Sequence, residues 1–314
     1  MRVLITGGAG FIGSHLADRL LIRGDEVLVI DNYATGRRDN LVPHPNLRVV
    51  EGTIADSSLV FDLCEHFKPD VVVHAAASYK DPGNWEEDVR TNILGGAIVT
   101  QASLEGRVKR LIYFQTALCY GVKPLEQPIT LNHPIRPGDS SYAISKTAAE
   151  QYIALSGIDF ISFRLANAYG PRNLSGPLPT FYHRLTENKA CFVVDTRRDF
   201  VFIRDLIEVV IMAIDGRGTS GFYHISSGSD YAIKDLFEAT VKALNITLQE
   251  KVEVRPRSSE DAPTILLDPT KTNEDFGWQV TTPLEIGVQK AIEWYREFGI
   301  NQTYTHLKSF ETRE

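Results

Sequence analysis

Tyr142 and Lys146 are the two side chains whose types and spacing most directly suggest proton chemistry. The segment 142–156 predicts a helix, and a four-residue spacing places both side chains on one helical face. A phenol with its ordinary pKa of about 10 is a poor base, but a neighbouring ammonium favours the phenolate. The pair could therefore move a proton at one atom of a bound molecule. Because this spacing is also common on surface helices, the argument needs a second element.

A glycine-rich turn near the N-terminus supplies that element. The motif Gly8-x-Gly10-x-x-Gly13 follows an apolar strand at residues 3–5 and opens a predicted helix at residues 11–23. Glycines permit a tight turn, and the amides at a helix N-terminus favour a pyrophosphate. The motif in this context predicts a dinucleotide site. A tight turn without a ligand is the simpler alternative.

The second predicted strand, 26–30, leads directly to Asp31. A carboxylate about 20 residues after the glycines can accept hydrogen bonds from the adenosine ribose. It would also repel a 2′-phosphate, so NAD is favoured over NADP. Arg37 and Arg38 in the following loop leave the phosphorylated cofactor open as an alternative.

Composition and charge exclude several other classes of protein. The chain has 314 residues and a net charge of −7, with scattered basic residues, so we expect no nucleic-acid partner. Cys64, Cys119 and Cys191 lie far apart, which indicates neither a disulfide framework nor a metal site. No apolar stretch matches a signal peptide or a membrane span. We therefore expect a cytoplasmic protein that does not associate with membranes.

Apolar strands alternate with helical patterns in the first half of the chain. Several strands are apolar on both faces, which is typical of a parallel sheet covered by helices on both sides. The expected strands are 26–30, 47–50, 70–74, 110–114 and 160–163, and the expected helices are 11–23, 57–66, 85–106 and 142–156. We predict an α/β doubly wound (Rossmann) domain over residues 1–165.

The sequence pattern changes after about residue 166: prolines and glycines are frequent in 169–179, and short predicted strands alternate with helices further on. We expect residues 166–314 to form mainly a smaller α/β substrate domain, which includes a strand at 222–226 and a helix at 233–244. Some of its segments should return to the Rossmann sheet. The substrate domain should lie over the carboxyl ends of the parallel strands, where such sheets bind ligands.

Together these residues resemble the extended short-chain dehydrogenases/reductases, and within them the NAD-dependent nucleotide-sugar epimerase/dehydratase family. The resemblance covers nearly the whole chain, and it includes a similarity to enzymes of lipopolysaccharide O-antigen clusters. It implies NAD as the cofactor and a catalytic role for Tyr142 and Lys146. The implied cofactor contacts are Gly7, Gly10, Phe11, Ile12, Gly13, Asp31, Asn32, Ile54, Ala75, Ala76, Ala77, Asn92, Tyr142 and Lys146.

The resemblance also implies a reaction. Thr116 occupies the position of the hydroxyl residue that orients the sugar, and Ala117 and Leu118 stand where related dehydratases and decarboxylases usually carry acids. Apolar side chains cannot transfer protons, so C4 epimerisation of a UDP-hexose through a 4-keto sugar is favoured. A dehydratase, decarboxylase or reductase on the same scaffold is the alternative. A non-catalytic NAD-sensing regulator would not need Thr116, Tyr142 and Lys146 together.

The implied substrate contacts lie mainly in the second half of the chain. They are Lys80, Thr116, Asn167, Arg198 and Arg257. Arg198 suits a diphosphate because a guanidinium presents a planar fork of donors. Ile265 falls near a position that limits sugar size, and its modest volume would admit an N-acetyl group. Family relatives pair through two long helices, so we expect a homodimer through residues 85–106 and 142–156.

Overall fold

A seven-stranded sheet forms the centre of the computed structural model, which describes residues 1–138, 140–257, 262–300 and 302–304. All neighbouring strands run parallel, in the order β11-β6-β5-β4-β1-β2-β3. The strands are β1 (Arg2–Thr6), β2 (Glu26–Asp31), β3 (Leu47–Glu51), β4 (Val71–His74), β5 (Arg110–Thr116), β6 (Phe160–Leu165) and β11 (Gly221–Ile225). The order reverses at β1 and β4, which is where doubly wound sheets bind ligands.

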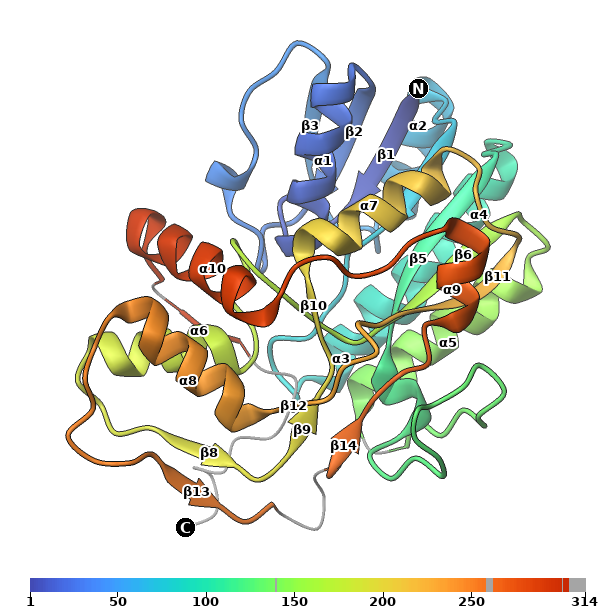
Figure 1. Ribbon diagram of the computed structural model, residues 1–314. Helices are drawn as coiled ribbons and strands as arrows, with labels where there is room; N and C mark the ends of the chain where they lie inside the picture. The colour runs from blue at the N-terminus through green and yellow to red at the C-terminus, as the bar shows by residue number, and fades with distance from the viewer. Residues whose placement is uncertain (139, 258–261, 301, 305–314) are drawn as a thin grey trace.

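Helices cover both faces of this sheet, as the apolar strands require (Figure 1). α1 (Phe11–Arg23) and α7 (Ile203–Ile214) pack together on one face. α2 (Ser57–Phe67), α4 (Gly96–Glu105) and α5 (Ser141–Leu155) pack together on the other. The buried strand residues therefore contribute to two separate cores, one on each face. The predicted Rossmann fold is confirmed.

Two sequence-based expectations differ from the structure. The strand expected in the smaller domain at 222–226 is β11, which pairs with β6 at the edge of the main sheet. The single helix expected at 85–106 is α3 (Trp85–Asp88), a π-helical turn η2 (Val89–Gly95) and then α4. A Cβ on Gly95 would lie 2.6 Å from Ile54 Cδ1 and one on Gly96 would lie 2.9 Å from Ala149 Cβ, so the glycines permit close packing there.

Most of the remaining elements gather at the carboxyl ends of the sheet strands, towards the lower left of Figure 1, whereas α9 (Thr270–Phe276) packs against β11 and α7. Their short strands form three small sheets, β10-β7, β12-β9-β14 and β13-β8. The strands are β7 (Asn167–Tyr169), β8 (Phe192–Val194), β9 (Arg197–Arg198), β10 (Phe200–Phe202), β12 (Tyr231–Ala232), β13 (Glu253–Arg255) and β14 (Thr264–Ile265). Because several of them come from distant parts of the sequence, this half of the molecule depends on tertiary contacts.

Helices α6, α8 and α10 pack around these strands. The remaining helical elements are α6 (Pro177–Thr186), α8 (Ile233–Leu244), α9 (Thr270–Phe276), α10 (Leu284–Phe298) and the 3₁₀ turns η1 (Arg38–Asn40) and η3 (Ala117–Tyr120). α8 confirms the helix expected at 233–244. We keep the division after residue 165 as a proposal, since β11 and α7 belong to the sheet layers. Across the described residues, no helix is long and apolar enough to cross a membrane.

Candidate active site

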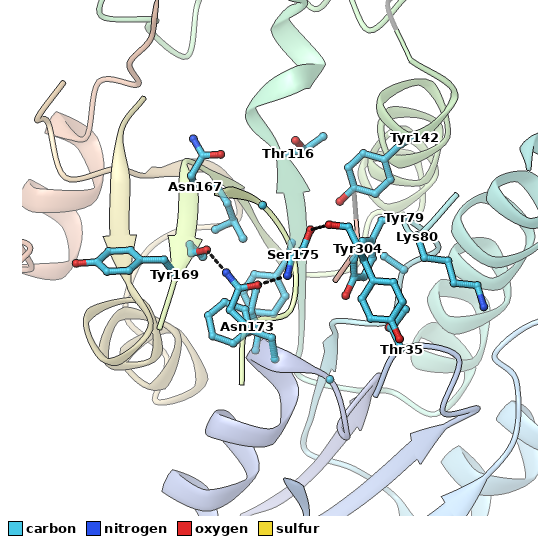
Figure 2. A pocket seen from close by; sticks show the side chains of 18 of the residues that line it. Thr35, Tyr79, Lys80, Thr116, Tyr142, Asn167, Tyr169, Asn173, Ser175 and Tyr304 are labelled. Atoms are coloured by element: carbon cyan, nitrogen blue, oxygen red, sulfur yellow. Dashed lines mark hydrogen bonds between the residues drawn. The ribbon is translucent and has the colours of Figure 1, made fainter. Parts of the chain in front are cut away.

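A cavity of about 1210 Å³ lies at the carboxyl ends of the sheet strands and continues between the smaller elements. Its walls come from the glycine turn, the loops after β2 and β4, the start of α5 and the small strands of the second half. Figure 2 shows Tyr142 and Lys80 on one side of the cavity, Asn167 and Tyr169 on the other and Thr116 between them. The same cavity thus contains both ends of the predicted site.

The glycine turn is closely packed against the loop after β4. Gly7 has φ of +68°, and a Cβ there would lie 2.6 Å from Ala76 Cα. A Cβ on Gly13 would collide with the Gly7 carbonyl oxygen. Gly10, the N-cap of α1, brings no side chain to the first turn, and Gly10, Phe11, Ile12 and Gly13 all line the cavity. Uncapped first-turn amides beside a cavity fit a pyrophosphate.

Asp31 lies at the end of β2 on the cavity wall. Its carboxylate accepts hydrogen bonds from the backbone N–H groups of Ala9 at 2.8 Å and Tyr33 at 2.7 Å. Burial raises the pKa of this carboxyl, while the two hydrogen bonds oppose the rise. Arg37 and Arg38 pair instead with Asp39 and Glu51, and neither lines the described cavity. The structure thus offers no support for a 2′-phosphate site at these two arginines.

Of the other expected cofactor residues, all except Asn92 are found on the cavity wall. Asn32, Ile54, Ala75, Ala76 and Ala77 line the cavity.

Asn92 is buried in η2 and, within the described part of the chain, does not line the cavity. Its Oδ1 accepts a hydrogen bond from Ser78 N at 2.8 Å, and its Nδ2 donates to Ser145 Oγ at 2.9 Å. The expectation of direct contact at Asn92 is therefore not supported. The residue instead connects the loop after β4 to α5.

The three expected catalytic residues meet at one place in the cavity. Thr116 is the last residue of β5, while Tyr142 and Lys146 occupy the first turns of α5, and all three line the cavity. Ser140 caps this helix by accepting a hydrogen bond from Ala143 N at 3.0 Å, which fixes where the helix begins. The same cavity is thus lined by a hydroxyl, a phenol and an amine.

The pKa values of the pair differ from the sequence-based expectation. Burial raises the pKa of the Tyr142 phenol well above its usual value, and nearby Tyr79 and Asp88 add to the rise. Burial also lowers the pKa of Lys146 to about 7, although the Glu150 carboxylate opposes this. We expected Lys146 to lower the pKa of Tyr142, but desolvation of both groups outweighs that attraction. Burial therefore disfavours the charged forms of both side chains, while the Glu150 carboxylate favours the ammonium of Lys146.

The expected substrate residues are only partly brought together. Lys80, Asn167 and Arg198 line the cavity with Thr116, whereas Arg257 is exposed and does not line it. Arg255, the last residue of β13, lines the cavity; it is exposed as well, and its Nε pairs with Glu253 Oε1 at 2.9 Å. The expectation for Arg257 stays a prediction, since within the described residues this side chain does not line the cavity.

Several cavity residues had no clear signal in the sequence. Tyr79 forms a side-chain hydrogen bond with Thr35, and its ring meets Tyr304 edge-on at 6.4 Å between ring centroids. Tyr304 comes from the C-terminal segment, where its backbone N–H donates to the Leu174 carbonyl at 2.8 Å. Arg184 of α6 also reaches the cavity. These residues are far apart in the sequence and come close together only in the folded structure, so a single sequence does not reveal them.

Within the described residues, no cluster of three or more His, Cys, Asp or Glu side chains could hold a metal ion. The fold and the cavity thus define a Rossmann protein with a dinucleotide site and a phenol–amine pair in one cavity. The chain belongs to the NAD dependent epimerase/dehydratase family, whose model matches residues 3–226. Membership of this family confirms the family prediction and NAD as its cofactor.

Solved structures and curated proteins agree with this assignment. The Bordetella bronchiseptica enzyme WbmH, solved with NAD+, is 55% identical, with a TM-score of 0.93 over 95% of this chain and 99% of that one. WbmG from the same organism, solved with NAD and UDP, is 42% identical, with a TM-score of 0.91 over 98% and 99% of the two chains. The UDP-glucose 4-epimerase of Mycolicibacterium smegmatis is 30% identical over 94% of this chain and 99% of its own. Decarboxylases and dehydratases also occur among the relatives.

Proposed function

We propose that the protein catalyses NAD-dependent epimerisation at C4 of a UDP-hexose through a transient 4-keto sugar. The supporting observation is that Thr116, Tyr142 and Lys146 line the cavity of the glycine turn, while Ala117 and Leu118 follow Thr116 on its wall. A dehydratase needs a proton donor near C5 and C6, and these two side chains cannot supply one. Relatives named as UDP-glucose 4-epimerases support the same proposal.

Each catalytic side chain has a distinct task in this proposal. Thr116 Oγ1 orients the C4 hydroxyl, Tyr142 Oη takes its proton, and Lys146 Nζ holds a positive charge that favours the phenolate. When bound, NAD supplies a positively charged hydride acceptor that returns the hydride in the same cycle. Inversion at C4 requires the 4-keto sugar to turn its other face towards the bound cofactor before Tyr142 returns the proton to the C4 oxygen. Asn167, Arg198 and Arg255 bind the nucleotide sugar, with the arginines at the diphosphate.

The alternative chemistry has one candidate residue of its own. Glu87 lines the cavity and accepts a hydrogen bond from Thr91 Oγ1 at 2.6 Å. Among the described cavity residues the acidic side chains are Asp31 and Glu87, and Glu87 is the one outside the expected cofactor contacts, so it would be available to a dehydratase or decarboxylase. A Glu87→Gln variant that keeps full activity would separate epimerisation from these reactions.

NMR spectroscopy of a panel of UDP-sugars, incubated with the purified protein and its copurified NAD, tests the proposal directly. We expect a product of unchanged mass with inverted configuration at C4, and formation of this product about 10³-fold more slowly by Tyr142→Phe. A changed sugar mass or a requirement for added NADPH would contradict it. Retention of NAD without turnover of any sugar would instead favour a regulator.

We propose that the sugar is N-acetylated or a uronic acid from surface polysaccharide synthesis in the cytoplasm. Lys80 is exposed on the cavity wall and can meet a carboxylate, while Ile265, whose side chain is smaller than an aromatic one, lines the same cavity. We expect Lys80→Met to raise KM for UDP-uronic acids but not for UDP-glucose. Equal effects on both would contradict a uronate site.

We further propose a homodimer through α3, η2, α4 and α5. These elements carry exposed apolar side chains, which would be unfavourable on a monomer. They are Trp85, Val89, Leu94, Leu104, Ile144, Tyr152 and Leu155. Light scattering should give twice the mass of the chain, and a monomeric mass would contradict the dimer.

A further inference from the structure

The ammonium of Lys146 lies against an aromatic ring. Lys146 is 2% exposed, and its Nζ lies 4.0 Å from the centroid of the Tyr113 ring. Tyr113 belongs to β5, three residues before Thr116, and is fully buried. A cation over the face of a ring is attracted by its quadrupole, and more strongly where water is excluded. The ring therefore favours the charged form of an amine that burial disfavours.

The same tyrosine also contacts the backbone of Lys146. Tyr113 Oη donates a hydrogen bond to the Lys146 carbonyl oxygen at 2.9 Å. This carbonyl lies within α5, where a carbonyl oxygen ordinarily accepts a hydrogen bond from the backbone N–H four residues later; the Tyr113 hydroxyl is an additional donor. One side chain of the sheet thus contacts both ends of the lysine. Its hydroxyl fixes the helical turn, and its ring supports the nitrogen.

Other charges near the lysine do less for it. Among the described residues, the titratable groups that act on Tyr142 and Lys146 include Tyr79 of the loop after β4, Asp88 of α3, His74 of β4, Tyr113 of β5 and Glu150 of α5. Glu150 favours the ammonium, but it accepts hydrogen bonds from Arg164 Nε at 3.1 Å and Nη2 at 2.9 Å, which offset its charge. Burial lowers the pKa of His74 to about 3, so its ring is neutral.

We propose that Tyr113 is a positioning residue for Lys146, which keeps the amine protonated and directed into the cavity. The inference rests on the proposed role of Lys146 as the cation beside Tyr142. It assigns a function to a residue that would otherwise be counted only as part of the sheet core. The hydroxyl and the ring make separable contributions, which matched substitutions can distinguish.

The direct test is a lysine NMR titration of the NAD-loaded protein. Protein labelled with ¹³Cε-lysine is titrated from pH 5 to 10, with Lys146→Met used to assign the signal. We expect Tyr113→Leu to lower the pKa of Lys146 by about one unit, because the ring's attraction is lost. Tyr113→Phe keeps the ring and should shift it by only about a few tenths of a unit.

A control addresses loss of packing. Tyr113→Leu leaves a cavity, so its melting temperature and NAD content are compared with those of Tyr113→Phe. If the leucine variant does not fold, a trifluorinated phenylalanine at position 113 keeps the ring shape while weakening its quadrupole. It should lower the pKa of Lys146 relative to the Phe variant. If the pKa of Lys146 is unchanged in folded Tyr113→Leu, or in the trifluorinated variant relative to Tyr113→Phe, the proposal is overturned.

Turnover gives a second measurement. If the ammonium is the active form, the high-pH limb of kcat should move to lower pH in Tyr113→Leu, with KM little changed. The decrease in kcat relative to wild type should be about tenfold at pH values above this transition and small at pH values below it. A uniform loss at all pH values would indicate a purely structural role. If no sugar is turned over, the titration still decides this inference independently of the proposed function.

Discussion

The two halves of the cavity are built in different ways. On the cofactor side, the wall consists of strand ends and helix starts, so each contact group is contiguous in sequence, as in Gly7–Gly13 or Ala75–Ala77. On the substrate side, the wall is assembled from β7, α6, β8, β9, β13 and the C-terminal segment. The first half is therefore fixed by local geometry, and the second by how short elements pack.

Because of this difference, we expect the two halves of the cavity to tolerate substitutions to different extents. A Cβ on Gly7 or Gly13 would meet backbone atoms, which cannot move without shifting the sheet or α1. Arg198 and Arg255, by contrast, lie on strands of two or three residues at the molecular periphery. We infer that the cofactor half sets the chemistry, while the substrate half can change its ligand with few structural consequences.

Substitution of Tyr142 by phenylalanine should have the largest effect. The ring and its packing remain, but the proton acceptor is lost, so kcat should fall by about 10³-fold. NAD content, read from the absorbance of the denatured supernatant, should stay unchanged. This result would place the chemistry at α5 and not in cofactor binding. Wild-type turnover would contradict the site as a whole.

The substrate side is tested by two arginines that lie two residues apart. Arg255→Ala removes a cavity side chain and should raise KM for the UDP-sugar by about 10- to 100-fold, because charge-assisted hydrogen bonds to a diphosphate are lost. Arg257→Ala is the matched control and should change KM by less than about twofold. Isothermal titration with UDP gives the same comparison without turnover. Equal effects of the two substitutions would contradict the placement of β13.

The same contrast explains what the sequence could predict. The parallel sheet, its covering helices and the glycine turn follow from local patterns, and each predicted strand lies within two residues of its observed bounds. The placement of Thr116, Tyr142 and Lys146 on one cavity wall could be predicted because strand ends and helix starts of this fold converge at one edge.

Where prediction failed, the determining contact was tertiary. Arg255 lines the cavity at the end of β13, and the pairing of β13 with β8 that positions this strand is not visible in the local sequence. β11 looks like any short strand, and its pairing with β6 spans about 60 residues. The pKa of Tyr142 followed burial, which depends on the complete fold.

Lys146 should lower the stability of the protein in a pH-dependent way. Burial lowers the folded-state pKa of Lys146 to about 7 from 10.5, so the unfolded state binds an extra proton between these values. The cost is complete below about pH 7 and disappears as pH rises towards 10.5. Lys146→Met should therefore raise the free energy of unfolding by at least about 1 kcal/mol at pH 6, and by less at pH 9. Urea unfolding of the NAD-free protein measures both, and a pH-independent difference would contradict the buried charge.

The smallest effect is expected where the two halves meet. The Tyr304 ring contacts Tyr79, whose hydroxyl group bonds to Thr35 of the loop after β2, so a substrate-side segment is connected to the cofactor side. Tyr304→Ala should speed NAD release by about 3- to 10-fold, because an aromatic pair contributes roughly 0.5–1.5 kcal/mol. Tyr304→Phe keeps the ring and is the control. Stopped-flow fluorescence of NADH release measures the rates. Equal release rates in the wild type, Tyr304→Ala and Tyr304→Phe would show that cofactor retention depends on the cofactor half alone. The two halves would then be more independent than the contact between Tyr304 and Tyr79 suggests.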